Sequence, residues 1–195
     1  MLTIALPKGR IADETLDRFE KAFGEKFVFE DRKLILEKSG FKFLNVRNQD
    51  VPTYVMHGAA DLGVVGLDVL EEKEYDLIKL LDLKLGRCKV AFGLRAGEKL
   101  NFDKSKITIA TKHEKIAKKY FEQKAMAVEI IKLYGSIELA PLVGLCDCIV
   151  DIVETGETMK QNGLEVGPTI METTAHLIAN KNSFLLAIFF TNVRL

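Results

Sequence analysis

The chain has 195 residues, of which 48% are hydrophobic and 29% are charged, so it can bury a full core as one large lobe or two small ones. Lysine plus arginine and aspartate plus glutamate number 28 each. This balance excludes an overall basic field of the kind that binds nucleic acid or an anionic membrane. No apolar run approaches transmembrane length, and the basic residues after Pro7 are in the wrong order for a signal peptide, so we expect a cytoplasmic protein.

Strands and helices alternate along the first part of the chain, which is typical of a wound α/β lobe. Apolar runs predict the strands, and amphipathic stretches predict the helices. In chain order the predicted elements are strand 2–6, helix 11–23, strands 33–37 and 41–46, helix 51–57, a buried strand and a helix start within 58–70, strand 77–81 and the apolar run 89–94.

The pattern begins again at Lys106, which predicts a second α/β lobe. Its elements are strand 107–110, helix 113–123, strand 128–133, helix 137–143, strand 148–153 and helix 158–162. The β-branched and threonine-rich run 165–181 could return to pair with the first lobe. We therefore expect residues 1–90 plus 164–195 to form the first lobe and residues 91–163 the second, with a ligand cleft between them.

The strongest functional signal is the stretch 149–158, where an apolar strand runs into an acidic, hydroxyl-rich turn that opens a helix. Gly156 lets the backbone turn tightly, so that N–H groups and threonine hydroxyls can converge on a phosphate. Asp151 and Glu154 would repel that phosphate unless they face sugar hydroxyls or Mg²⁺. A ribose 5-phosphate with a metal-bound pyrophosphate offers both, which suggests phosphoribosyl pyrophosphate (PRPP). The same turn is also ordinary connecting structure.

A basic turn follows the first predicted strand. Lys8 and Arg10 flank Gly9 there, and the two cations could bind a phosphate between them. The alternative is that both are solvated loop charges. Arg32, just before the next strand, is by itself an ordinary flanking charge.

The cysteines and histidines show no metal-ligand spacing. Cys146 and Cys148 alternate along an apolar strand, and we expect them, with Cys88, to be reduced packing residues. His113 is the second residue of the charged run 112–119, which we interpret as a solvated helix face whose first residues could reach a cleft.

Five segments taken together resemble the ATP phosphoribosyltransferase family, whose enzymes open histidine biosynthesis. They are residues 6–10, 50–55, 58–68, 132–141 and 151–158, and the resemblance spans residues 2 to about 180. It implies an α/β fold of two lobes with a cleft between them, like type II periplasmic solute-binding proteins. It also implies that N1 of the adenine of ATP attacks the anomeric carbon of PRPP, with inversion and release of pyrophosphate.

The resemblance implies a role for each motif. Arg10 and Arg32 would be catalytic, because cations at the leaving pyrophosphate stabilise the transition state more than the ground state. Mg²⁺ would be the cofactor, and Asp151 or Glu154 the carboxylate that meets it. The implied PRPP-binding residues are Asp151, Glu154, Thr155, Gly156, Glu157 and Thr158, and those for ATP and pyrophosphate are Lys8, Gly9, Arg10 and Arg32.

The length of the chain matches the short form of this family, which lacks a C-terminal regulatory domain. Short forms imply a homodimer within a hetero-oligomer that includes a regulatory subunit resembling a histidyl-tRNA synthetase. The tail 182–195 is more apolar than the terminal helix of such enzymes, and it could pack into an interface. Two alternatives stay open, a salvage phosphoribosyltransferase and a non-catalytic, two-lobed solute-binding protein.

Overall fold

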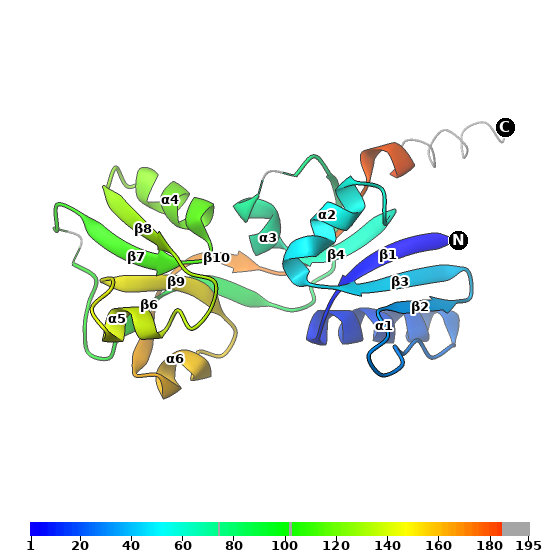
Figure 1. Ribbon diagram of the computed structural model, residues 1–195, viewed down its shortest axis with the longest axis horizontal. Helices are drawn as coiled ribbons and strands as arrows, with labels where there is room; N and C mark the ends of the chain where they lie inside the picture. The colour runs from blue at the N-terminus through cyan, green and yellow to red at the C-terminus, as the bar shows by residue number, and fades with distance from the viewer. Residues whose placement is uncertain (74, 102, 185–195) are drawn as a thin grey trace. The chain divides into compact units, whose positions relative to one another are not determined.

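The computed structural model describes residues 1–73, 75–101 and 103–184, so most of the apolar tail lies outside the described residues. The chain divides into two compact units (Figure 1). The first comprises Met1–Gly86 with the chain from Thr174 onward, and the second is Arg87–Thr173. Each unit has its own mixed sheet covered by helices, which confirms the predicted two-lobed α/β fold. No described helix is both long and apolar enough to cross a membrane.

The first unit contains a six-stranded sheet in the order β2-β3-β1-β4-β11-β5. Neighbours β3, β1 and β4 are parallel, and the other pairs are antiparallel. One face packs against α1 through a cluster of phenylalanines, and the other packs against α2 through small and branched side chains. The elements are β1 Leu2–Pro7, α1 Arg10–Phe23, β2 Ile35–Lys38, β3 Phe41–Val46, the 3₁₀ turn Asn48–Asp50, α2 Val51–Met56, β4 Leu62–Gly66, α3 Leu67–Glu72, β5 Ile78–Asp82 and β11 Ala175–Ala179.

The second unit contains a five-stranded sheet in the order β10-β6-β9-β7-β8. Neighbours β9, β7 and β8 are parallel, so their carboxyl ends lie at one edge of the sheet. Its core has two parts, one built around Phe92 and Phe121 and the other around Ile137 and Met159. The elements are β6 Cys88–Arg95, β7 Ile107–Thr111, α4 Glu114–Glu122, β8 Val128–Lys132, α5 Leu139–Leu142, β9 Cys148–Val153, α6 Glu157–Gln161 and β10 Leu164–Thr173.

The structure differs from the sequence-based expectation at the return of the chain. Residues 164–173 form β10, which pairs antiparallel with β6 of the second sheet from Leu164↔Arg95 to Thr173↔Cys88. Only β11 lies in the first sheet. A β-branched, threonine-rich pattern indicates a strand but does not say which edge the strand joins, so the pattern alone could not separate β10 from β11.

Cys88, Cys146 and Cys148 form no disulfide bond with one another. Cys146 and Cys148 are buried in the second unit, and burial raises the pKa of the Cys148 thiol. Cys88 at the start of β6 is half-buried.

Candidate active site

The acidic turn of the second unit follows β9 at the edge where the parallel strands end. β9 lies beside β7 in the register Thr111↔Val150, so the residues that follow these two strands are neighbours. Gly156 precedes α6 in a left-handed conformation with φ of +82°, and a Cβ there would lie 2.9 Å from Cγ2 of Val166. Glycine is therefore needed at this corner for both its conformation and its small volume.

A cavity of about 320 Å³ runs along this turn. Its wall is formed by residues 151–159 together with Cys88 and Glu138. The turn is organised locally, since the backbone N–H of Glu157 donates to Oγ1 of Thr155 at 3.3 Å. The structure thus gathers around one cavity all six residues that the sequence predicts for PRPP, which are Asp151, Glu154, Thr155, Gly156, Glu157 and Thr158.

Asp151 is the most enclosed carboxylate of this wall for which contacts are recorded, with a side chain 15% exposed. Nζ of Lys112 lies 3.0 Å from its Oδ1, and the backbone N–H of Ile152 donates to the same oxygen at 2.8 Å. Nε2 of His113 lies 3.8 Å from that oxygen. The residues after β7 therefore place positive charge beside an acidic wall.

The sequence predicts a solvated helix face over 112–119 whose first residues could reach a cleft, but it assigns no role to Lys112. In the structure Lys112 precedes α4, and His113, at the start of that helix, is buried with 4% exposure. The signal was present in the chain order, because a residue that directly follows one parallel strand lies beside the residue that follows its neighbour.

The basic turn of the first unit joins β1 to α1. Gly9 adopts φ of +93° and ψ of −154°, a region that is nearly exclusive to glycine, and the N–H of Lys8 donates to the carbonyl of Val46 at 2.8 Å. The side chain of Arg10 is 47% exposed, and its Nε lies 3.8 Å from Oε1 of Glu14. The turn thus carries two cationic residues, Lys8 and Arg10, on either side of a backbone conformation that is specific to glycine.

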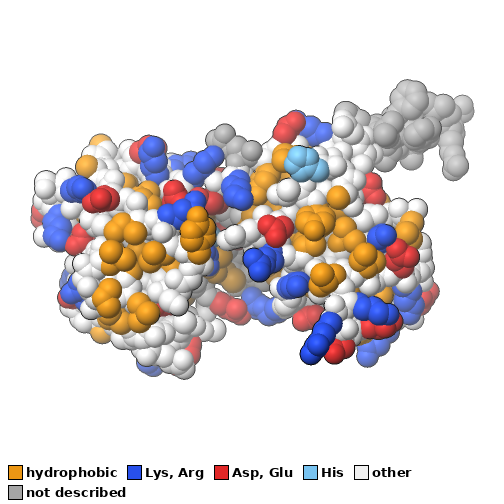
Figure 2. Space-filling view, in the orientation of Figure 1, with side chains coloured by type: hydrophobic (Ala, Val, Ile, Leu, Met, Phe, Trp, Pro, Cys, Tyr) orange, Lys and Arg blue, Asp and Glu red, His pale blue; other side chains and the backbone are white. Residues whose placement is uncertain are grey.

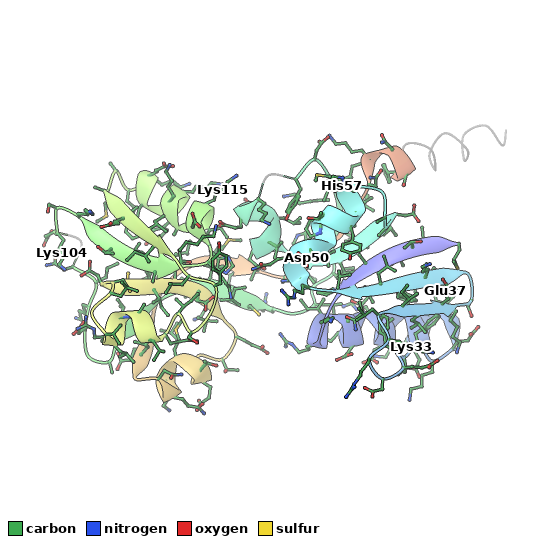
Figure 3. All side chains as sticks on the ribbon, viewed as in Figure 1. Lys33, Glu37, Asp50, His57, Lys104 and Lys115 are labelled. Atoms are coloured by element: carbon green, nitrogen blue, oxygen red, sulfur yellow. The ribbon has the colours of Figure 1, made fainter. Side chains whose placement is uncertain are left out.

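Arg32 lies in the loop before β2, next to Lys33, which is labelled in Figure 3. Its side chain is 94% exposed and 4.0 Å from a carboxylate oxygen of Asp31. The backbone N–H of Asn45 near the end of β3 donates to the carbonyl of Leu34. Because β1 and β3 are parallel, this loop and the turn with Arg10 stand at the same edge of the first sheet.

Charged side chains of both signs lie on the face drawn in Figure 2. They are interspersed over that face, in keeping with the balanced composition. Among residues 1–73, 75–101 and 103–184, no group of three or more histidine, cysteine, aspartate or glutamate residues is placed to hold a metal ion.

Comparisons with known proteins agree with this arrangement. The family model described as HisG: ATP phosphoribosyltransferase matches residues 47–190. The ATP phosphoribosyltransferase of Wolinella succinogenes is 69% identical over 184 residues, which cover 94% of this chain and 89% of the relative. That of Sulfurovum sp. is 67% identical with the same coverage.

Solved structures give the same result for the fold. The structure titled ATP phosphoribosyl transferase (HisG:HisZ) complex from Thermotoga maritima superposes with a TM-score of 0.80 at 36% identity, covering 99% of this chain and 94% of that one. An arginine-bound protein, Tv2483, superposes with a TM-score of 0.61 at 15% identity, covering 95% of this chain and 79% of that one. The second similarity concerns the fold alone.

Proposed function

The chain belongs to the ATP phosphoribosyltransferase family, whose reaction is the first step of histidine biosynthesis, and we propose that its two loop clusters divide the substrates of that reaction between them. The enzyme is a pentosyltransferase. N1 of the adenine of ATP attacks the anomeric carbon of PRPP, the bond to the pyrophosphate breaks, and the configuration at that carbon inverts. Because N1 carries no proton, no general base has to act at the nucleophile.

PRPP binds at the acidic turn in this proposal. The 5-phosphate takes hydrogen bonds from backbone N–H groups and hydroxyls of Thr155 to Thr158, since the first N–H groups of a helix have no partner within it. Asp151 and Glu154 accept hydrogen bonds from the ribose hydroxyls. The observation that carries the proposal is the single cavity that all six predicted residues line.

Lys8, Arg10 and Arg32 bind the phosphates of ATP and the leaving pyrophosphate. Negative charge grows on the pyrophosphate as its bond to the sugar breaks, so cations at that group bind the transition state more strongly than the ground state. Gly9 supports this role because its backbone geometry, closed to other residues, sets the direction of the turn. Arg10 and Arg32 are the catalytic residues of the proposal.

Enzymes of this family generally need a metal ion, and Mg²⁺ is the ion that suits PRPP. Mg²⁺ is usually held by one or two carboxylates together with substrate phosphates. The acidic wall fits that mode, because it offers Asp151 and Glu154 but no complete cage. Asp151 and Glu154 would be the residues that meet a Mg²⁺ ion, which would supply charge shielding for the pyrophosphate of PRPP, and the same residues would orient the sugar.

We propose a partner by analogy with the Thermotoga maritima complex, whose title pairs HisG with HisZ. The partner would be a regulatory subunit resembling histidyl-tRNA synthetase, bound to homodimers of this chain as in short-form enzymes. The curated relatives are matched over 89% of their own length, which supports the short form. The complex would act in the cytoplasm, and histidine would inhibit it only when the regulatory subunit is bound.

The direct test is turnover. The purified chain, alone and with the regulatory subunit, is incubated with PRPP, ATP and Mg²⁺, and pyrophosphatase draws the reaction forward while adenine absorbance is followed. We expect product only when PRPP is present, and we expect Thr155→Ala to raise KM for PRPP while leaving KM for ATP unchanged. No turnover with either preparation would favour a non-catalytic solute-binding protein, and turnover with a free base in place of ATP would favour a salvage enzyme.

A further inference from the structure

We propose that Lys112 is a positioning residue for PRPP, which holds the carboxylate of Asp151 in the orientation that accepts the ribose hydroxyls. The inference rests on the proposed role of the acidic turn and names a residue outside that turn. Lys112 is not part of the cavity wall, so its effect on the substrate passes through Asp151.

The backbone around Lys112 is held in place by hydrogen bonds of the preceding residue, Thr111. Thr111, fully buried, donates its hydroxyl to the carbonyl of Val150 at 2.6 Å and accepts the N–H of His113 at 2.8 Å. One hydroxyl thus ties the end of β7 to β9 and shapes the corner before α4. Lys112, between the two bonded residues, is presented to Asp151 by a rigid support and not by a free loop.

The neighbours of the Asp151 carboxylate approach one of its two oxygens. Within the part of the chain that the structure describes, Lys112, Ile152 and His113 all approach Oδ1, at 3.0, 2.8 and 3.8 Å. The hydrogen bond from the N–H of Ile152 and the ion pair with Lys112 meet at one oxygen and restrain the plane of the carboxylate. Oδ2 is left for the ligand, which is the arrangement that a hydroxyl-binding carboxylate requires.

Charge gives a second reason for Lys112. The cavity wall carries the carboxylates of Glu138, Asp151, Glu154 and Glu157, and PRPP is a polyanion. The side chains of Lys112 and Asp151 are only 30% and 15% exposed, so their attraction is less screened than that of a surface pair. Neutralising the most enclosed carboxylate lowers the repulsion that the phosphates meet on entry.

The experiment compares Lys112→Met with Lys112→Arg in the complete enzyme. Loss of a charged hydrogen bond at a partly exposed site should raise KM for PRPP about tenfold, with KM for ATP and kcat within about twofold. Arginine should restore most of the loss because it keeps the charge and the donor. Lys118→Met is the matched control, since Lys118 lies on α4 and pairs with Glu122 in solvent. It should change neither constant.

A double-mutant cycle separates positioning from direct contact. In the Asp151→Asn background, Lys112→Met should raise KM for PRPP little further, because the effect of Lys112 passes through the carboxylate that has been removed. A full tenfold loss in that background would overturn the inference, as would an unchanged KM for PRPP in Lys112→Met or an equal loss in Lys118→Met. Wild-type turnover is measured in the same experiment. If the proposed function is wrong, the wild-type enzyme shows no turnover, whereas if only this inference is wrong, the wild-type enzyme is active and Lys112→Met leaves KM for PRPP unchanged. Thermal unfolding of each variant shows that it is folded.

Discussion

Replacing Gly156 by alanine tests whether the shape of the acidic turn holds PRPP. Alanine would have to adopt the left-handed backbone of Gly156, which costs a residue with a Cβ about 1–2 kcal/mol. Its Cβ would also lie 2.9 Å from Cγ2 of Val166, a stiff side chain, so the turn itself must shift. With the contact included, we expect the free energy of unfolding to fall by about 2–3 kcal/mol. The displaced N–H groups should raise KM for PRPP about tenfold.

The matched control is Gly163→Ala. Gly163 is also left-handed, with φ of +71°, but a Cβ there has open space, and the residue is not part of the cavity wall. Gly163→Ala should therefore lower the free energy of unfolding only by the cost of the left-handed backbone, about 1–2 kcal/mol, and leave KM for PRPP unchanged. Urea unfolding and initial rates measure the two effects. Equal losses of stability in the two variants, with KM for PRPP unchanged in both, would refute the reasoning.

Three further predictions follow from the described side chains. Arg10→Ala and Arg32→Ala should each lower kcat by about a hundredfold while PRPP binding, followed by calorimetry, is retained; full turnover would contradict their role at the leaving group. Cys88 lines the cavity, so PRPP at about ten times its Kd should slow thiol modification about tenfold, whereas an unchanged rate would place PRPP elsewhere. The Lys104 ammonium and the Thr108 N–H hold the pKa of Asp147 below its usual value. The ionised carboxylate therefore stabilises the fold above its ordinary pKa, and this stabilisation is lost as the pH falls through the pKa of the folded state. Asp147→Asn should lower the free energy of unfolding in urea by up to about 1 kcal/mol at neutral pH and leave it unchanged in strong acid, and an equal loss at both pH values would contradict the assignment.

The sequence predicts most elements of this fold because most are marked by local chemistry. The predicted strands 41–46 and 148–153 coincide with β3 and β9, where apolar side chains run between polar turns. α5 is shorter than the predicted helix 137–143 and spans Leu139–Leu142. Apolar periodicity marks a helix but not the residue where the backbone leaves it.

Contacts between segments that are distant in the sequence are harder to predict than the elements themselves. The pattern of β10 states that it is a strand, but its pairing with β6 depends on the other edges that are open, which no local window contains. The role of Lys112 stays open in the sequence for the same reason, although the first residues of the run 112–119 are predicted to be able to reach a cleft. In a run of charged residues Lys112 has no distinguishing feature, and only its register beside Val150 and Asp151 separates it from the solvated lysines of α4.

The distribution of charge explains how a chain of zero net charge can bind polyanions. In the proposed function, backbone N–H groups and hydroxyls of the acidic turn bind the 5-phosphate, and Lys112 neutralises Asp151 while the carboxylates remain available for the sugar hydroxyls. Lys8, Arg10 and Arg32, the cations proposed for the leaving pyrophosphate, belong to the first unit, where the side chains of Arg10 and Arg32 are 47% and 94% exposed. In this proposal, ground-state binding and transition-state stabilisation belong to different loops. Changes in the turn should consequently appear in KM for PRPP, and changes in the arginines should appear in kcat, because only the second group meets charge that the substrate does not yet carry.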